Sequence, residues 1–295
     1  MEALRLTEVG KRYGRSGPWV LRGVGLALEP GVLVRIEGVN GSGKSTLLKL
    51  VAGIEPPSRG RLRVAGRRAY VPERFPPALP FDPAGYLRHL GRIHGLSTAV
   101  AADRAEFWLD RFGITDRAGT PLARLSKGTC QKVAVAQALL AEADVLLLDE
   151  AWTGLDQAAR TTLDEAAMER AGAGGVVLFV DHDPNRLAGL TSRAFQLRQG
   201  GLTEVQPPGA EEPRERMSVL VAAGELPEWL PGTPEREDRP DGTVLLRVAA
   251  GQSDALLRRL LTAPAELRIL DVSKIDGAPV GKPVSEPADA PEVAR

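Results

Sequence analysis

Three short apolar runs predict the central strands of this chain. They cover residues 32–36, 145–148 and 176–180, and such runs are typical of strands buried on both faces of a parallel sheet. Residues 46–52 predict a helix that stops at Gly53, and residues 133–143 form a second helical run. Strands that alternate with helices in this way indicate an α/β fold with a parallel sheet.

The remaining patterns predict the elements outside that sheet. Leu4–Glu8 and Val24–Leu28 predict short strands of a small β layer, and residues 74–124 lean toward helix. The prolines of Phe75–Pro80 predict a loop. For any single aromatic residue of the helical stretch, such as Phe107 or Trp108, packing between helices is the favoured interpretation.

A change of composition at residues 206–216, rich in charge and proline, predicts a linker between two domains. Beyond it we expect a small α/β appendage over 217–276 and, over 277–295, a disordered tail without periodicity. The elements expected in the appendage are three strands and one helix: Met217–Ala223, Thr243–Val248 and Leu267–Val272 as strands, and Asp254–Leu261 as the helix. The large domain is predicted to span residues 1–205.

Composition limits the functions that this chain can have. The 38 basic and 38 acidic side chains give a formal net charge of zero, so charge provides no argument for binding nucleic acid. The single cysteine, Cys130, excludes an internal disulfide and fits a reducing cytoplasm. No apolar stretch is long enough to span a bilayer, and the first residues lack the core of a signal peptide.

Residues Gly38–Ser45 spell G-V-N-G-S-G-K-S, a complete phosphate-binding loop between a predicted strand and a predicted helix. Glycines allow several backbone N–H groups to point at one anion, and the helix N-terminus adds partial positive charge. Lys44 is expected to reach the β- and γ-phosphates, and the Ser45 hydroxyl to bind Mg²⁺. The predicted nucleotide-binding residues here are Gly38, Asn40, Gly41, Ser42, Gly43, Lys44, Ser45 and Thr46.

Two carboxylates follow the apolar run 145–148 directly. A buried strand that ends in Asp149 would place this carboxylate beside the Mg²⁺ held by Ser45. Glu150 would then lie near the γ-phosphate and could act as general base toward the attacking water. Lys44 and Glu150 are therefore candidate catalytic residues.

Residues 125–132, L-S-K-G-T-C-Q-K, resemble the signature sequence of the ATP-binding cassette family, with Leu125, Ser126 and Gly128 at matching positions. Further matches follow in the family's order, and together they cover roughly residues 2–205. Tyr13 resembles the residue that stacks on adenine, and Thr153–Asp156 resemble the D-loop at the dimer interface. His182, which follows the strand 176–180, resembles the switch histidine that contacts the γ-phosphate, and the resemblance makes it the third candidate catalytic residue. The resemblance implies a P-loop ATPase core with a parallel sheet, a small antiparallel β layer and a helical subdomain, whose exposed aromatic residues could form a surface for a membrane partner.

Glu73 departs from this resemblance, because the family has glutamine at the corresponding position of its Q-loop. The carboxylate could still bind Mg²⁺ and nucleotide, but it adds negative charge near the phosphates. We expect hydrolysis to be retained and the tuning of the cycle to change.

The resemblance implies an ATPase subunit that uses ATP and Mg²⁺ to drive a transporter, with export favoured by the C-terminal appendage and import as an alternative. It implies a second copy of this chain, with Ser126, Gly128 and Asp156 facing the partner's nucleotide. A permease on a separate chain would hold the protein at the inner face of the cell membrane. The other hypotheses are a soluble cassette ATPase acting on nucleic acid or ribosomes, and a regulatory protein that scarcely hydrolyses ATP.

Overall fold

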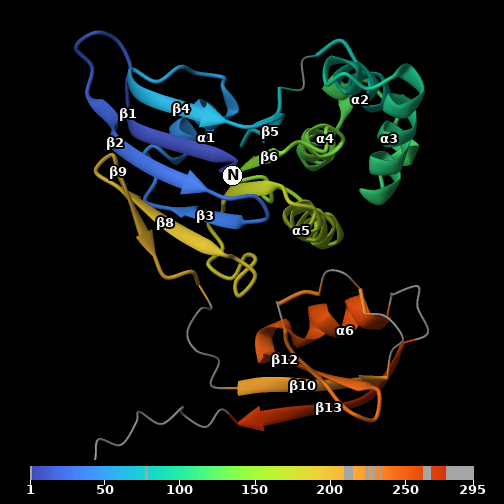
Figure 1. Cartoon of the computed structure of the whole chain (residues 1–295). Coiled ribbons are helices and arrows are strands. Elements are labelled where there is room, and N and C mark those ends of the chain that lie inside the picture. The colour runs from blue at the N-terminus through green and yellow to red at the C-terminus, as the bar shows by residue number, and fades with distance from the viewer. Residues whose placement is uncertain are drawn as a thin grey trace, which may run out of the picture. The chain divides into compact units, whose positions relative to one another are not determined.

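The computed structural model describes residues 2–76, 79–208, 215–222, 226–227, 230–232, 234–261 and 267–276. The chain divides into two compact units, Met1–Ala210 and Glu211–Arg295 (Figure 1). Each unit has its own hydrophobic core.

A six-stranded sheet forms the centre of the first unit and confirms the predicted parallel sheet. Its strands run in the order β5-β6-β7-β3-β8-β9, and all neighbours are parallel except the antiparallel pair β8 and β9. The strands are β3 (Leu33–Glu37), β5 (Arg68–Val71), β6 (Val145–Asp149), β7 (Val176–Val180), β8 (Arg193–Arg198) and β9 (Gly201–Val205). The three central strands match the predicted apolar runs within one residue at each end.

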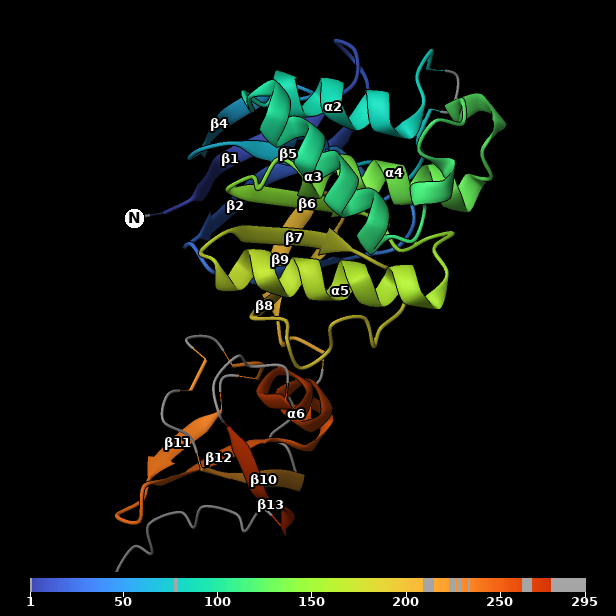
Figure 2. The ribbon, with the colours of Figure 1, turned by 90° about the vertical axis from the view of Figure 1, so that its right-hand side faces the viewer.

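Both faces of this sheet are buried, because successive side chains of the central strands enter two different core clusters. In β6, Val145 and Leu147 pack in the same cluster as helix α1 (Lys44–Ala52), whereas Leu146 and Leu148 pack toward the other helices. Successive side chains of a strand point to opposite faces, so an unbroken apolar run is what a sheet covered on both sides requires. Helix α5 (Gln157–Gly172) covers the second face beside β7 (Figure 2).

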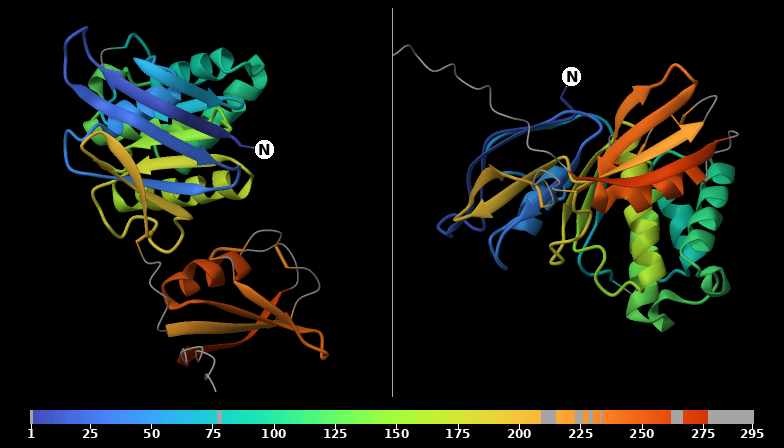
Figure 3. Two further views of the ribbon diagram at one scale, coloured as in Figure 1. Left: turned by 60° about the vertical axis from the view of Figure 1, so that its left-hand side comes forward. Right: turned by 90° about the horizontal axis from the view of Figure 1, so that it is seen from below.

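A small antiparallel β layer is present, as predicted, and it packs over α1. It has the order β2-β1-β4, with β1 (Leu4–Arg12), β2 (Trp19–Leu28) and β4 (Arg59–Val64) (Figure 3, left). Both β1 and β2 are longer than the predicted strands. Buried residues of β1 and β2 share one core cluster with α1 and the sheet, which holds the phosphate loop between the two layers.

Residues 74–124 contribute the helices α2 (Pro83–Ile93) and α3 (Thr98–Arg111) and the short 3₁₀ turns η1 (Thr115–Arg117) and η2 (Leu122–Arg124). Helix α4 (Lys127–Leu139) packs against both α2 and α3. Trp108 is buried and is therefore a packing residue, whereas Phe107 is 53% exposed.

Helix α4 includes the first part of the predicted helical run 133–143 but starts earlier and ends earlier than that run. Helix α4 begins six residues earlier because Ser126 caps it, accepting a hydrogen bond from the Thr129 amide at 3.1 Å. It ends at Leu139, and Glu142 follows with a positive φ of 44° that a helix cannot continue through.

The described residues of the second unit form a four-stranded antiparallel sheet with one α-helix against one face (Figure 3). The sheet order is β11-β12-β10-β13, and helix α6 supplies Leu256 and Leu260 to the core. The elements are β10 (Glu215–Ala222), β11 (Glu235–Asp238), β12 (Thr243–Ala249), η3 (Ala250–Gln252), α6 (Ser253–Leu261) and β13 (Arg268–Asp276). Strand β11 was not predicted from the sequence.

The predicted linker and tail fall largely outside the described residues. Residues 209–214 and 277–295 are not described, and strand β10 already begins at Glu215, within the predicted linker. None of the helices that the structure describes is long and apolar enough to cross a membrane.

Candidate nucleotide site

The phosphate loop follows β3, and two of its glycines have no tolerated replacement. Gly38 has a φ of 151°, and a Cβ there would lie 2.6 Å from the Leu197 carbonyl oxygen. Gly43 has a φ of 106°, and its Cβ would lie 2.9 Å from a methyl group of Val20. Such a backbone favours glycine and turns successive N–H groups toward one point, which suits an anion.

Two polar side chains of the loop are prepared for a charged ligand. The Lys44 ammonium is buried and donates to the carbonyl oxygens of Gly38 at 2.7 Å and Val39 at 3.2 Å. The Ser42 hydroxyl is buried and, within the described part of the chain, has no hydrogen-bond partner. A buried hydroxyl without a partner costs about 1–3 kcal/mol, so this loop fits a phosphate that would supply the missing acceptor.

Asp149 is the last residue of strand β6, and its carboxylate contacts the end of the phosphate loop. The Ser45 hydroxyl donates to its Oδ1 at 3.0 Å, and the Tyr70 hydroxyl donates to its Oδ2 at 2.8 Å. Burial raises the pKa of Asp149, although both hydroxyl groups act in the opposite direction. Burial and the neighbouring Asp149 also raise the pKa of Tyr70, so the phenol remains a donor.

The donor set around Asp149 fits Mg²⁺, which prefers oxygen ligands and usually binds through one or two carboxylates plus substrate phosphates. Ser45 and Asp149 supply a hydroxyl and a carboxylate within hydrogen-bond distance of each other. No cluster of three or more metal-binding side chains of histidine, cysteine, aspartate or glutamate occurs among the described residues.

Glu150 and His182 meet at the ends of neighbouring strands. The Glu150 Oε1 lies 2.9 Å from the His182 Nε2, and the Glu150 amide donates to the Val180 carbonyl at 3.0 Å. In the register of β6 and β7, Asp149 pairs with Val180, which brings the residues after each strand together. Glu150 has a positive φ of 51°, an uncommon conformation for a residue with a side chain.

Tyr13 and Glu73 lie at the margin of this group. The Tyr13 hydroxyl is 3.3 Å from the Thr46 Oγ1 and donates to Glu55 at 3.2 Å, so the exposed ring lies beside the start of α1. Glu73 is about half exposed, and its nearest described ionic partner is Arg74 at 3.6 Å. The charge of Glu73 nevertheless contributes to the raised pKa of Asp149, so it acts on the predicted metal site.

The residues matched to the signature and D-loop form a second group of their own. Ser126 caps α4, and Asp156 caps α5 by accepting from the Ala159 amide at 2.9 Å. Lys132 of α4 lies 2.7 Å from the Asp156 carboxylate and lowers its pKa. A Cβ on Gly128 would lie 2.9 Å from the Gly154 carbonyl oxygen, so the two segments pack backbone to backbone.

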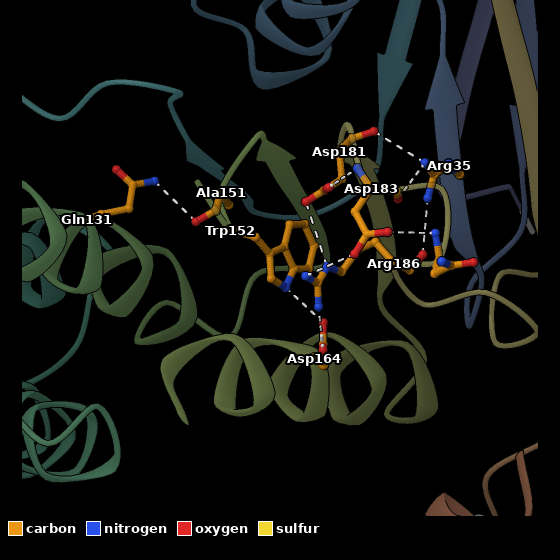
Figure 4. A network of polar contacts seen from close by, with 9 residues as sticks. Arg35, Gln131, Ala151, Trp152, Asp164, Asp181, Asp183 and Arg186 are labelled. Atoms are coloured by element: carbon orange, nitrogen blue, oxygen red, sulfur yellow. Dashed lines mark hydrogen bonds and ion pairs between the residues drawn. The ribbon is translucent and has the colours of Figure 1, made fainter. Parts of the chain in front are cut away.

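Several residues around the site were not predicted from the sequence. Tyr70 holds Asp149, and Arg35, Trp152, Asp164 and Arg186 form a polar network with Asp181 and Asp183, the residues on either side of His182 in the chain (Figure 4). Of these residues, Arg35 could have been noticed in the sequence, because a charged residue inside an apolar strand requires a buried partner. The other network residues stand in no recognisable motif.

A glycine-rich loop at a helix N-terminus, a hydroxyl paired with a strand-end carboxylate, and a nearby glutamate define the class of P-loop nucleoside triphosphatases. The comparisons then identify the family. A family model described as ABC transporter matches residues 21–153. SsuB of Burkholderia thailandensis, an aliphatic sulfonates import ATP-binding protein, is 36% identical over 265 residues, which cover 86% of this chain and 70% of SsuB.

Two further similarities agree with this result. MacB of Salmonella choleraesuis, a macrolide export ATP-binding/permease protein, is 31% identical over 252 residues, covering 77% of this chain and 38% of MacB. A solved ATP-binding subunit of an ABC transporter superimposes with a TM-score of 0.64 at 27% identity, covering 69% of this chain and 90% of that one. The chain belongs to the ATP-binding cassette family, whose members bind ATP with Mg²⁺ and hydrolyse it.

Proposed function

We propose that this protein powers a membrane transporter by binding ATP between two copies of itself and hydrolysing it with the residues at the ends of β3, β6 and β7. The observation that carries this proposal is the pair of contacts Ser45–Asp149 at 3.0 Å and Glu150–His182 at 2.9 Å, beside one phosphate loop. They bring a metal-binding pair and an acid–base pair to one edge of the sheet.

Each side chain has a distinct task in this proposal. Lys44 and the loop amides bind the phosphates, and the Tyr13 ring stacks on adenine. Ser45 and Asp149 hold Mg²⁺, with Glu73 as a third oxygen donor. When bound, the metal neutralises charge on the phosphate oxygens. Glu150 accepts a proton from the attacking water.

His182 completes the hydrolytic group by contacting the γ-phosphate and holding the geometry of the water. Its Nε2 lies 2.9 Å from Glu150, so one imidazole can face both the base and the phosphate. Positioned groups of this kind are the main source of catalysis in phosphoryl transfer, since little covalent chemistry remains for the protein.

The second nucleotide-facing surface is the group around Ser126, Gly128 and Asp156. Ser126 is exposed, and the first amides of α4 offer an anion-binding helix N-terminus. The described hydrogen bonds of Ser126 and Asp156 lie within this group and do not reach the phosphate loop of the same chain. In our proposal it therefore closes over the nucleotide of a second copy, and opening follows hydrolysis.

We further propose that the permease is a separate chain and holds this protein at the inner face of the cell membrane. The similarity to SsuB, an import ATP-binding protein, supports a subunit without its own permease. Export remains the expectation from the sequence and import the alternative, because the relatives include both an import and an export protein. The site chemistry is the same for both directions.

Affinity purification from gently solubilised native membranes, with partners identified by mass spectrometry, tests the proposal. Recovery of a multi-span membrane protein in near-equal amount would support it, and ATP-driven uptake or efflux in vesicles containing both chains would assign the direction. Recovery of only ribosomal or nucleic-acid-processing partners would replace the transporter by a soluble cassette ATPase.

A further inference from the structure

Arg35 is a buried charge in the strand that leads to the phosphate loop. Its side chain is 4% exposed, and Nε donates to Glu37 Oε1 at 2.9 Å. The rest of the guanidinium faces the segment that carries His182 (Figure 4). It donates to the carbonyl oxygens of Asp181 at 3.3 Å, Asp183 at 2.9 Å and Arg186 at 3.1 Å. One arginine therefore holds the backbone on both sides of His182.

Arg186 contacts the same segment through the carboxylates of Asp181 and Asp183. Its NH1 donates to Asp164 of α5 at 2.9 Å, and its guanidinium lies 3.6 Å from Asp183 and 3.8 Å from Asp181. Only 12% of this side chain is exposed, so water screens these interactions weakly. Arg186 thus connects Asp181 and Asp183, the two carboxylates that flank His182, to helix α5.

Trp152 extends the network to the residues that follow Glu150. Its indole N–H donates to Asp164 at 2.8 Å, and the Arg186 guanidinium lies over its ring at 5.5 Å. The indole is almost fully buried and also contacts Phe179 edge-on. Asp164 therefore connects the segment after Glu150 with the segment around His182.

The His182 imidazole itself has little to hold it. Its side chain is 57% exposed, and its described polar partner is Glu150. A side chain with so much solvent around it cannot be oriented by packing, so its position depends on the backbone that carries it. That backbone is fixed by the contacts of Arg35 and Arg186.

We propose that Arg35 and Arg186 are positioning residues that hold His182 against Glu150, and that Trp152 and Asp164 lock Arg186 in place. The inference rests on the proposed roles of His182 and Glu150 in hydrolysis. A displacement of about 1 Å in a catalytic group can cost about a hundredfold in rate. Loss of this network should therefore reduce turnover, whereas nucleotide binding, which depends mainly on Lys44 and the loop amides, is largely retained.

Arg111 provides a matched control for Arg186. It pairs with two carboxylates of the same helix α5, Glu169 at 2.8 Å and Glu165 at 3.6 Å, and lies over the Trp108 ring at 5.2 Å. Arg111→Met thus removes a similar cluster from α5, but one with no described contact to the segment around His182. Arg186→Met should cost more stability than Arg111→Met, because Asp164 is 25% exposed whereas Glu165 and Glu169 are 38% and 57% exposed.

The test uses the full chain with isotopically labelled histidine, because the protein has only three histidines. His182→Ala assigns the His182 imidazole signal in a two-dimensional NMR spectrum, and the signals of the parent, Arg186→Met and Arg111→Met are compared. Arg186→Met should shift the His182 signal and lower kcat by about tenfold to a hundredfold, with KM and ATP affinity within about twofold. Arg111→Met should change neither.

A folded Arg186→Met protein whose His182 signal coincides with the parent signal would overturn the inference. Should Arg186→Met fail to fold, Trp152→Phe decides in the same way, because it removes the indole donor to Asp164 while keeping an aromatic ring beside Arg186 and Phe179. A shifted signal with unchanged kcat would uphold the positioning and instead refute the role of His182 in the proposed function.

Discussion

Replacing Glu150 by glutamine tests the proposed general base with the least change of shape. The carboxylate is 19% exposed and lies 2.9 Å from the His182 Nε2. Glutamine has the same size and can keep a hydrogen bond to the imidazole, but its amide cannot accept a proton from water. The change therefore removes one chemical property and leaves the packing intact.

The expected loss follows from the part that a general base plays in the rate. Such a group contributes about 10²- to 10⁴-fold, so kcat should fall by this factor, equal to about 3–5 kcal/mol in activation free energy. ATP binding should persist, since Lys44 and the loop amides are unchanged. ATP at 100 times its Kd should then stabilise the variant by at least about 2.7 kcal/mol, the value for one site without association.

Three measurements are needed for parent and variant. The rate of phosphate release gives kcat, denaturant unfolding with and without Mg·ATP gives the free energy of ATP binding, and size-exclusion chromatography shows whether the protein is a monomer or a dimer.

Glu142→Gln is the control variant, because Glu142 also has a positive φ, 44° against 51° for Glu150. Glu142 pairs with Arg104 at 2.7 Å, away from the site. The control should hydrolyse at the parent rate.

The Glu150→Gln protein should accumulate as an ATP-bound dimer, since closure would no longer be followed by hydrolysis. Hydrolysis at the parent rate would show that Glu150 is not the base. Loss of ATP binding together with turnover would refute the division between binding and chemical residues. A slow variant that stays monomeric with saturating Mg·ATP would refute the proposed closure on a second copy.

Other substitutions test the remaining parts of the site. Lys44→Ala should weaken ATP binding by about tenfold or more, because it removes a buried phosphate-binding charge; an unchanged Kd in a titration would contradict this. Tyr13→Phe should keep nucleotide affinity while Tyr13→Ala lowers it several-fold, since stacking requires the ring and not the hydroxyl; equal losses would exclude stacking. Glu73→Gln should leave kcat within a few-fold but raise the Mg²⁺ concentration for half-maximal turnover, because one carboxylate near the metal is lost; an unchanged Mg²⁺ dependence would remove Glu73 from the metal site. Burial raises the pKa of Asp164, so the folded chain keeps this proton to a higher pH than the unfolded chain does. The free energy of unfolding of the parent should therefore rise relative to Asp164→Asn as the pH falls from neutrality, and the reverse trend in denaturant titrations would mean that Arg186 holds this pKa below its ordinary value.

The sequence was most informative where a local pattern defines the structure by itself. The apolar runs of β3, β6 and β7 are buried on both faces, and strands of this kind place their carboxyl ends at one edge of the sheet. The contact between Ser45 and Asp149 follows from that rule although the two residues are 104 positions apart. Motif and sheet geometry together were sufficient to predict it.

Strand β11 was missed because it lacks an apolar pattern altogether. Its four residues, Glu235–Asp238, are charged and exposed, and they form an edge of the second sheet. Charged residues are common on edge strands, where they prevent pairing with other chains. The pairing with β12 is thus determined by β12 and the turn between them, which the pattern of β11 itself cannot reveal.

The polar network that flanks His182 could not be predicted for a different reason. Its contacts join residues that are far apart in the chain, for example Arg35 and Asp183 over 148 positions, and none of them repeats at a helical or strand period. They arise because β7 lies between β6 and β3 in the sheet, whereas β3 comes first in the chain. Only the strand order brings Arg35 under the segment that follows β7.

This strand order also explains why a costly buried charge is found in β3. A buried arginine is stabilised only when its donors are satisfied, and an apolar residue of similar volume is often as stable or more so. The donors of Arg35 go to backbone carbonyls around His182 and to Glu37, so its contacts fix a loop that apolar packing would leave free to move. Stability alone therefore does not explain an arginine at position 35. The need to fix His182 beside Glu150 does explain it.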